Sequence, residues 1–132
     1  MVSVEQKNID EDLDYMFTPS RWVVRMKQDE VVEDFVTSVS KAREELLLSP
    51  TVEKELDIVY FTEGDTKCCV DIYKPNKAAT DAPVVLFIHG GYWQECSKIH
   101  GAFPARSLIK NGIITVAVGY TIAPEGKKVK KY

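Results

Sequence analysis

Near the middle of the chain an apolar run ends in a histidine that two glycines follow. His89, Gly90 and Gly91 come directly before the aromatic pair Tyr92 and Trp93. Because glycine lacks a Cβ, the backbone here can turn sharply and bring N–H groups within hydrogen-bond reach of another molecule. Such donors stabilise an oxygen that develops negative charge, and each typically contributes ~2.7–4 kcal/mol to a transition state. The stretch therefore has the residue types of an anion-stabilising loop.

Two strands of the buried kind flank this loop. Residues 83–89 and 112–120 are almost continuously apolar, a pattern typical of parallel strands whose faces are both covered. Between them, residues 97–111 have apolar side chains at loosely helical spacing and end at Asn-Gly, a common helix stop. A strand, a helix and a second strand in this order predict a parallel, right-handed βαβ unit.

Upstream of this unit, the sequence predicts a helix and a hairpin. Apolar positions recur at three- and four-residue intervals over residues 30–48, which is the helical period. Residues 56–61 and 68–73 are rich in β-formers and flank a Gly-Asp turn, so they predict an antiparallel pair. We therefore expect an α/β fold with a mixed sheet, in an incomplete domain at residues 30–132. Residues 1–29 are expected to form an irregular N-terminal arm.

Composition and charge exclude several classes of partner. The 132 residues are 45% hydrophobic and 28% charged, which is ordinary for one globular domain. The net charge of -3 disfavours nucleic acid and anionic membrane surfaces, since both favour basic proteins. The acidic N-terminus has no signal-peptide pattern, and no apolar run approaches the ~18 residues that span a bilayer. We expect a cytoplasmic (cytosolic) protein whose ligand is a small molecule.

The cysteines and the lysine-rich tail have ordinary interpretations. Cys68, Cys69 and Cys96 are odd in number and lack metal-ligand spacing, so we expect reduced thiols and no metal or other cofactor. Cys96 precedes Ser97, but no base lies near the pair in sequence, which disfavours a thiol nucleophile. Residues 127–131 contain four lysines and predict the solvated start of a helix. A phosphate-binding or nuclear-import patch is the alternative there.

Four stretches of the chain together resemble one enzyme family. HGGYW at residues 89–93 is similar to the HGGxW motif of the kynurenine formamidases (arylformamidases), which are α/β-hydrolases. YMFTPSRWVVRM, CCVDIYKP and VAVGYTIAPEG resemble further segments of that family and occur in the same order. The resemblance covers residues 15–126 and implies the N-terminal portion of an α/β-hydrolase fold.

The same resemblance implies roles for individual residues. The amides of Gly91 and Tyr92 would be oxyanion donors, because the loop after the third strand of these enzymes faces the substrate carbonyl. His89 would anchor the loop by hydrogen bonds to backbone and would not act as a base. Trp93, with Gly90 nearby, would line the substrate pocket. The family hydrolyses N-formyl-L-kynurenine to L-kynurenine and formate in tryptophan catabolism.

At the catalytic residues, however, the sequence departs from the family. Such hydrolases need a serine in a Gly-x-Ser-x-Gly elbow, followed in chain order by an Asp and a His. The 132 residues contain no such elbow, and both histidines, His89 and His100, precede the place where it should come. We therefore expect the front half of a formamidase-like serine hydrolase, inactive as written. Its reading frame should continue into a helix, an apolar strand and the elbow.

Three other interpretations stay open. The chain could be a non-catalytic truncated form that binds a partner, such as a full-length homologue or a second copy, through an exposed sheet edge. The family's strand order would leave residues 83–89 as an uncharged open edge, the kind of segment that pairs with other chains. The chain could also come from an esterase or lipase-like hydrolase with another substrate. For His-Gly-Gly itself, a strand-to-helix turn with a buried aromatic pair and no catalytic role is the alternative.

We predict that the 132-residue polypeptide has no formamidase or esterase turnover. An oxyanion loop has little to act on without a nucleophile and without the second donor beside that nucleophile. Hydrolysis of N-formyl-kynurenine and of a p-nitrophenyl ester by the purified chain should equal that of an unrelated protein. Activity above this level that follows the chain through a further purification step would contradict the prediction.

Overall fold

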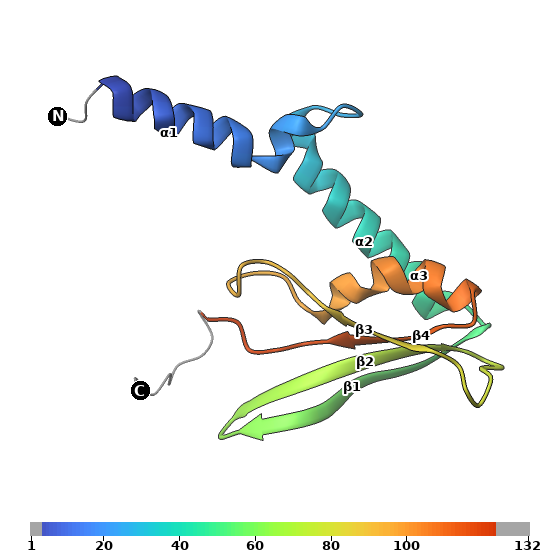
Figure 1. Cartoon of the computed structure of the whole chain (residues 1–132). Coiled ribbons are helices and arrows are strands. Elements are labelled where there is room, and N and C mark those ends of the chain that lie inside the picture. Colours follow the sequence, from blue (N-terminus) through green and yellow to red (C-terminus); the bar gives the residue numbers. More distant parts are fainter. Residues whose placement is uncertain (1–3, 124–132) are drawn as a thin grey trace. The chain divides into compact units, whose positions relative to one another are not determined.

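A computed structural model describes residues 4–123 of the chain (Figure 1). The chain divides into two compact units between residues 37 and 38, inside a helix. The helices and strands are, in chain order, α1 (Val4–Phe17), α2 (Val31–Leu48), β1 (Val52–Glu63), β2 (Thr66–Pro75), β3 (Val84–Ile88), α3 (Ala102–Lys110) and β4 (Ile114–Val118). Short 3-10 helices are η1 (Pro19–Trp22), η2 (Gln28–Glu30) and η3 (Lys98–Gly101).

The N-terminal unit contains a helix where we expected an irregular arm. α1 contains neither glycine nor proline, and it ends two residues before Pro19. The expectation of an irregular arm is therefore wrong for the residues of α1. Apolar side chains are sparse in this stretch, so the sequence pattern did not indicate a helix, but the stretch also lacks helix breakers. After α1 the chain folds back, so that the Nε1 of Trp22 donates to the carbonyl of Tyr15 at 3.2 Å. The domain boundary that we expected between residues 29 and 30 stays a prediction.

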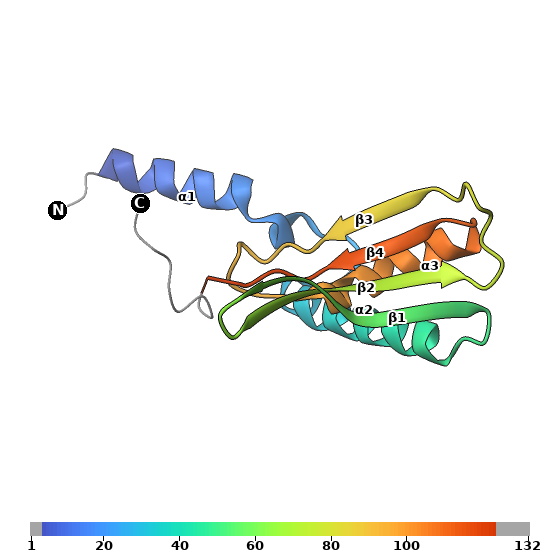
Figure 2. The same cartoon turned by 90° about the horizontal axis from the view of Figure 1, so that it is seen from below.

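A four-stranded mixed sheet forms the centre of the second unit, with the strand order β1-β2-β4-β3 (Figure 2). β1 and β2 form the expected antiparallel hairpin, and β2 pairs antiparallel with β4. β3 and β4 pair in parallel over five positions, from Val84 opposite Ile114 to Ile88 opposite Val118. The predicted hairpin and the predicted parallel βαβ unit are confirmed.

Small side chains let α3 pack closely on one side of this sheet (Figure 1). Ala102 and Ala105 of α3 and Ala117 of β4 are completely buried. A Cβ added to Gly101, just before α3, would lie only 2.4 Å from the Cβ of Ala117. The three alanines belong to one core cluster, whose members are Leu46, Val52, Tyr73, Ala102, Ala105, Ile109 and Ala117.

β3 is more exposed than its apolar sequence indicates. We expected both faces of residues 83–89 to be covered, but Leu86 and Ile88 are 64% and 66% exposed. That expectation is wrong for the described chain, because Phe87 faces Gly101 before α3, so the alternate side chains of Leu86 and Ile88 lie on the opposite face. β3 is also an edge strand of the described sheet, with β4 as its neighbour. The open, uncharged edge that we also expected is thus present, and such edges favour pairing with another strand.

Several further expectations concern groups outside the core. Cys68, Cys69 and Cys96 form no disulfide in the structure, and their interpretation as reduced thiols stays a prediction. Residues 4–123 contain no group of three or more metal-ligating side chains in reach of one another. None of the helices in this range is both long enough and apolar enough to cross a bilayer. The lysine-rich stretch at residues 127–131 lies outside the described residues.

We predict that Gly101→Ala destabilises the chain by about 1–3 kcal/mol, the usual cost of overpacking a core. The new methyl group would overlap the Cβ of Ala117, which cannot move without shifting β4. Urea unfolding measures the effect, with Gly90→Ala as the control because a Cβ there meets nothing within 4 Å. Gly101→Ala should cost less in an Ala117→Gly background. Equal costs in both backgrounds would show that the two residues do not clash.

Candidate functional site

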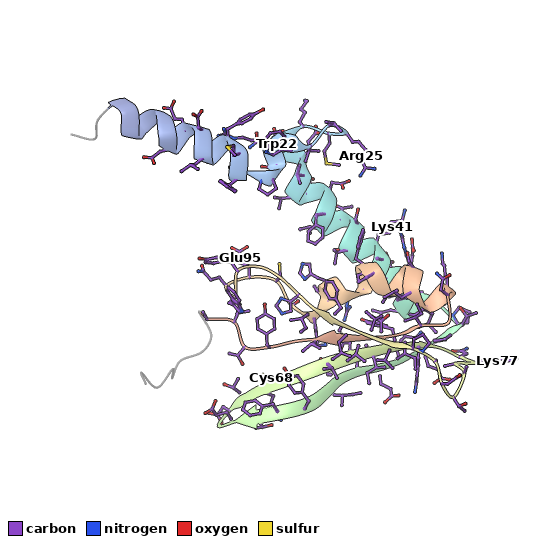
Figure 3. All side chains as sticks on the ribbon, viewed as in Figure 1. Trp22, Arg25, Lys41, Cys68, Lys77 and Glu95 are labelled. Atoms are coloured by element: carbon purple, nitrogen blue, oxygen red, sulfur yellow. The ribbon has the colours of Figure 1, made fainter. Side chains whose placement is uncertain are left out.

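A loop at residues 90–97 follows β3 and precedes η3. The loop carries Glu95, which projects beyond the strands (Figure 3). Because β3 and β4 are parallel, their carboxyl ends lie at the same edge of the sheet, so the loop lies beside the segment that leaves β4. Ligands of open α/β sheets bind outside the carboxyl ends of the strands.

The loop backbone adopts a conformation that only a glycine at position 91 fits. Gly91 has φ of 108°, and the amides of Gln94 and Glu95 both donate to its carbonyl, at 2.9 and 3.0 Å. A Cβ on Gly91 would lie 2.2 Å from the carbonyl oxygen of Glu95. Gly90 has no such restriction, since a Cβ there would meet nothing within 4 Å. Of the two glycines, Gly91 therefore determines the shape of the loop.

Three non-glycine residues of the loop also have left-handed backbone angles. Tyr92, Trp93 and Cys96 have φ values of 53°, 58° and 69°. This region is uncommon for residues with a Cβ, and it persists where surrounding contacts over-determine it, often at active sites. Within residues 4–123, the amides of Gly91 and Tyr92 donate no hydrogen bond to another backbone group. Neither of these two amides thus has a backbone acceptor among the described residues.

His89 joins the start of the loop to the segment after β4. Its side chain is buried, and its Nδ1 lies 2.9 Å from the carbonyl oxygen of Gly90, to which it donates. Its ring stacks on Tyr120, with centroids 4.2 Å apart and planes 6° from parallel. The hydroxyl of Tyr120 donates to the carbonyl of His89 at 2.8 Å. These contacts are those of an anchor, and the anchor role itself stays a prediction.

A second contact holds the far side of the loop. The amide of Ala123 donates to the carbonyl of Trp93 at 2.6 Å. Tyr120 and Ala123 are the first and fourth residues of the Tyr-x-x-Ala-Pro stretch in the sequence. Tyr120 and Ala123 donate hydrogen bonds to the carbonyls of His89 and Trp93. The structure therefore gives a physical reason why HGGYW and YTIAP occur in one chain. Sequence reasoning noted the stretch but did not find this role.

The aromatic side chains of the loop point away from the described chain. Tyr92 and Trp93 are 81% and 67% exposed, and their rings contact each other with centroids 5.8 Å apart. A cavity of about 440 Å³ lies near the loop, and His89, Cys96 and Tyr120 line it, but Trp93 does not. The pocket-lining role of Trp93 therefore stays a prediction, because its side chain is not among those that line this cavity.

The Nδ1 atoms of both histidines face backbone atoms. The Nδ1 of His100 lies 2.9 Å from the carbonyl oxygen of Ser97 and 3.2 Å from its amide nitrogen. Nδ1 of His89 faces the carbonyl of Gly90. The described loop thus presents the adjacent amides of Gly91 and Tyr92, which are donors of the kind that stabilise a developing oxyanion.

Comparisons with known proteins identify relatives over most of the chain. The BD-FAE family model matches residues 70–129. The chain is 37% identical over 116 residues to the kynurenine formamidase of Salmo salar, a match that covers 88% of this chain and 38% of that protein. It is 35% identical over 116 residues, with the same coverage, to the kynurenine formamidase of Danio rerio. The resemblance to the kynurenine formamidases is confirmed. This chain spans 38% of the length of these curated relatives.

Solved structures agree on the fold. The crystal structure of a candidate thioesterase from Silicibacter sp. has a TM-score of 0.58 and 20% identity, over 86% of this chain and 40% of that one. At this identity the likeness concerns the fold alone. Together with the mixed sheet and its helices, it confirms the α/β-hydrolase fold that the sequence predicted.

We predict that Tyr120→Phe destabilises the chain by about 0.5–1.5 kcal/mol, the net worth of one intramolecular hydrogen bond. The change keeps the stacked ring but removes the hydroxyl that donates to the carbonyl of His89. Tyr92→Phe is the matched control, since that ring is 81% exposed. Urea unfolding midpoints compare the two. If both variants shifted the midpoint equally, the hydrogen bond to His89 would not stabilise the fold.

Proposed function

We propose that residues 84–123 form the oxyanion-stabilising part of a kynurenine formamidase-like serine hydrolase in the cytosol. The relatives of the chain are hydrolases that act on small molecules. One observation carries the proposal. The amides of Gly91 and Tyr92, which have no backbone acceptor within residues 4–123, are adjacent in a loop with left-handed angles that is held at His89 by Tyr120 and at Trp93 by Ala123.

The reaction that this loop would support is hydrolysis of a formamide such as N-formyl-L-kynurenine. When a serine oxygen attacks the formyl carbon, the electron pair of the C=O bond moves onto the oxygen. The amides of Gly91 and Tyr92 would donate to that oxyanion without reorganising, because the loop is already fixed. The C–N bond then breaks, the amine leaves with a proton, and water releases formate from the serine. The 132 residues provide neither this serine nor its acid and base, and the reaction needs no cofactor.

The choice of substrate rests on sequence and not on the loop. Two amide donors would stabilise the oxyanion of an ester or a thioester equally well, because the developing charge is on the same oxygen. The formamide is favoured because the match to the formamidases extends over 88% of the chain, well beyond the loop. An esterase with another substrate remains the nearest alternative.

A binding role without catalysis is the second candidate function. β3 is the observation that favours it, since its edge is open and four of its five side chains are at least 37% exposed. The partner would be a second copy of the chain or a homologue that adds a strand to this edge. Sedimentation of the purified chain tests this candidate, which predicts association that charged substitutions in β3 abolish.

A chimera tests the hydrolase proposal. Residues 1–123 of this chain would replace the matching N-terminal segment of the Danio rerio kynurenine formamidase, whose remaining chain lies outside the match. The chimera should hydrolyse N-formyl-kynurenine. Loss of turnover in a chimera that is folded by circular dichroism and unfolds cooperatively would contradict the proposal.

Within the chimera, we predict that Gly91→Ala lowers kcat about 10²–10³-fold, the usual effect of losing one oxyanion donor. The new Cβ would overlap the carbonyl of Glu95 and displace the amides of the loop. Gly90→Ala is the comparison variant and should lower kcat less than Gly91→Ala, because a Cβ at Gly90 meets nothing of the chain within 4 Å and leaves the loop backbone in place. Near-normal turnover of Gly91→Ala would show that the donors are elsewhere. The β-branched Gly91→Val should be at least as inactive.

A further inference from the structure

A lysine at the exit of the loop is bound by two carboxylates. Lys98 begins η3, directly after residues 90–97, and its side chain is only 16% exposed. Its ammonium lies 2.8 Å from the Oδ1 of Asp57 on β1 and forms a short ion pair with the Oδ1 of Asp71 on β2. One charged group therefore connects the end of the loop to two strands of the sheet. We call Lys98, Asp57 and Asp71 the ion triad.

An irregularity in β1 places Asp57 in the triad. The register between β1 and β2 shifts between Glu55 and Ile58, and Asp57 inside this shift has φ of 57°. The amide of Asp57 donates to the Oδ1 of Asp71 at 2.9 Å, so Asp71 fixes the irregular backbone as well as the lysine. A β-bulge re-aims a side chain, and bulges are frequent next to active sites. Here the bulge brings a second carboxylate to Lys98.

Asp71 makes Lys98 hard to replace. The side chain of Asp71 is completely buried, and a buried charge without its partner is strongly destabilising. Burial lowers the pKa of Lys98, but hydrogen bonds and charges from Asp57 and Asp71 outweigh it, so the pKa of Lys98 is raised. The hydrogen bond from Lys98 and its charge lower the pKa of Asp57. All the partners that bind Lys98 thus favour its charged form.

The stem of Lys98 also contacts the segment that clasps the loop. A Cβ on Gly119 would lie 3.2 Å from the Cδ of Lys98 and 2.9 Å from the carbonyl of Cys69. The amide of Gly119 donates to that carbonyl at 2.9 Å, which fixes the chain just before Tyr120. Tyr120 in turn holds His89. Lys98 therefore lies beside the backbone of Gly119, which precedes Tyr120, and it is covalently joined to the C-terminal end of the loop.

We propose that Lys98 is a positioning residue for the loop at residues 90–97, with Asp71 and Asp57 as its fixed counter-charges. The ion triad sets where the loop ends relative to β2 and β4, and hence where the amides of Gly91 and Tyr92 are presented. The importance of this position for catalysis rests on the hydrolase function proposed above. The position itself is a property of the 132-residue chain and can be measured without turnover.

Amide hydrogen exchange of the 15N-labelled chain tests the proposal in Lys98→Met. The reporters are the amides of Gln94, Glu95 and Ala123, whose hydrogen bonds exist only when the loop is in place. Their exchange should become faster by about tenfold or more relative to amides of the β2–β4 ladder, since local opening exposes the loop before the sheet. Lys98→Arg keeps the charge and should restore most of this protection.

Lys74→Met is the matched control. Lys74 also binds two carboxylates, at 2.7 Å from Glu55 and 3.4 Å from Glu53. It lies on the β1–β2 hairpin, as do Asp57 and Asp71. Its loss should leave the three loop reporters unchanged relative to the ladder. Equal acceleration of loop and ladder amides in Lys98→Met would mean that the triad only stabilises the fold, and would overturn the proposal. No rescue by Lys98→Arg would also overturn it.

If Lys98→Met does not fold, Asp57→Asn provides the same test. The side chain of Asp57 is 76% exposed, and Asp71 would still neutralise Lys98, so this variant should fold. It should accelerate the loop reporters selectively, by about threefold, because one of two counter-charges is lost. Unchanged reporters would overturn the proposal. Selective acceleration together with an inactive chimera would instead retain the positioning role and reject the hydrolase function.

Discussion

The parallel pairing of β3 with β4 is the constraint on which the rest of the second unit depends. Parallel neighbours need a crossover, and α3 provides it by packing over the two strands. The chain before α3 can pack close to β4 because Gly101 has no side chain and that of Ala117 is small. The same pairing brings the ends of β3 and β4 to one edge of the sheet. The contacts of Tyr120 and Ala123 with the loop depend on that adjacency.

The loop has an improbable backbone that its neighbours stabilise. Three residues with a Cβ have left-handed angles, and each such residue costs free energy that other contacts must offset. The stack and hydrogen bond of Tyr120, the amide of Ala123 and the ion triad at Lys98 act at three separate points. All of these partners lie on the sheet or directly after it. The conformation is therefore built in before any ligand binds, as electrostatic stabilisation of an oxyanion requires.

Local patterns predicted the elements but not the contacts between them. The helix at α2, the hairpin and the βαβ unit followed from apolar spacing and turn residues, and His-Gly-Gly indicated the loop. α1 was not predicted because its apolar residues are sparse. The exposure of β3 was not predicted because an apolar sequence does not show whether other elements cover both faces of the strand. The stack of His89 on Tyr120 joins residues 31 positions apart, so it depends on strand register. A signal for the triad did exist: Asp71 interrupts a β-rich run, and a carboxylate on a buried strand requires a partner.

The open edge of β3 and the donor amides of the loop lie at the same place for a physical reason. β3 leads directly into the loop, so a strand that paired in parallel with its open side would end beside Gly91 and Tyr92. The residue after such a strand would reach an oxygen held by those amides, and this is the position that an attacking serine needs. An uncharged edge is otherwise a liability, because it pairs indiscriminately. The apolar character of β3 is thus explained if the strand that covers it also supplies the nucleophile. Covering the edge and completing the site would then be one event, and the donor loop would not depend on it for its shape.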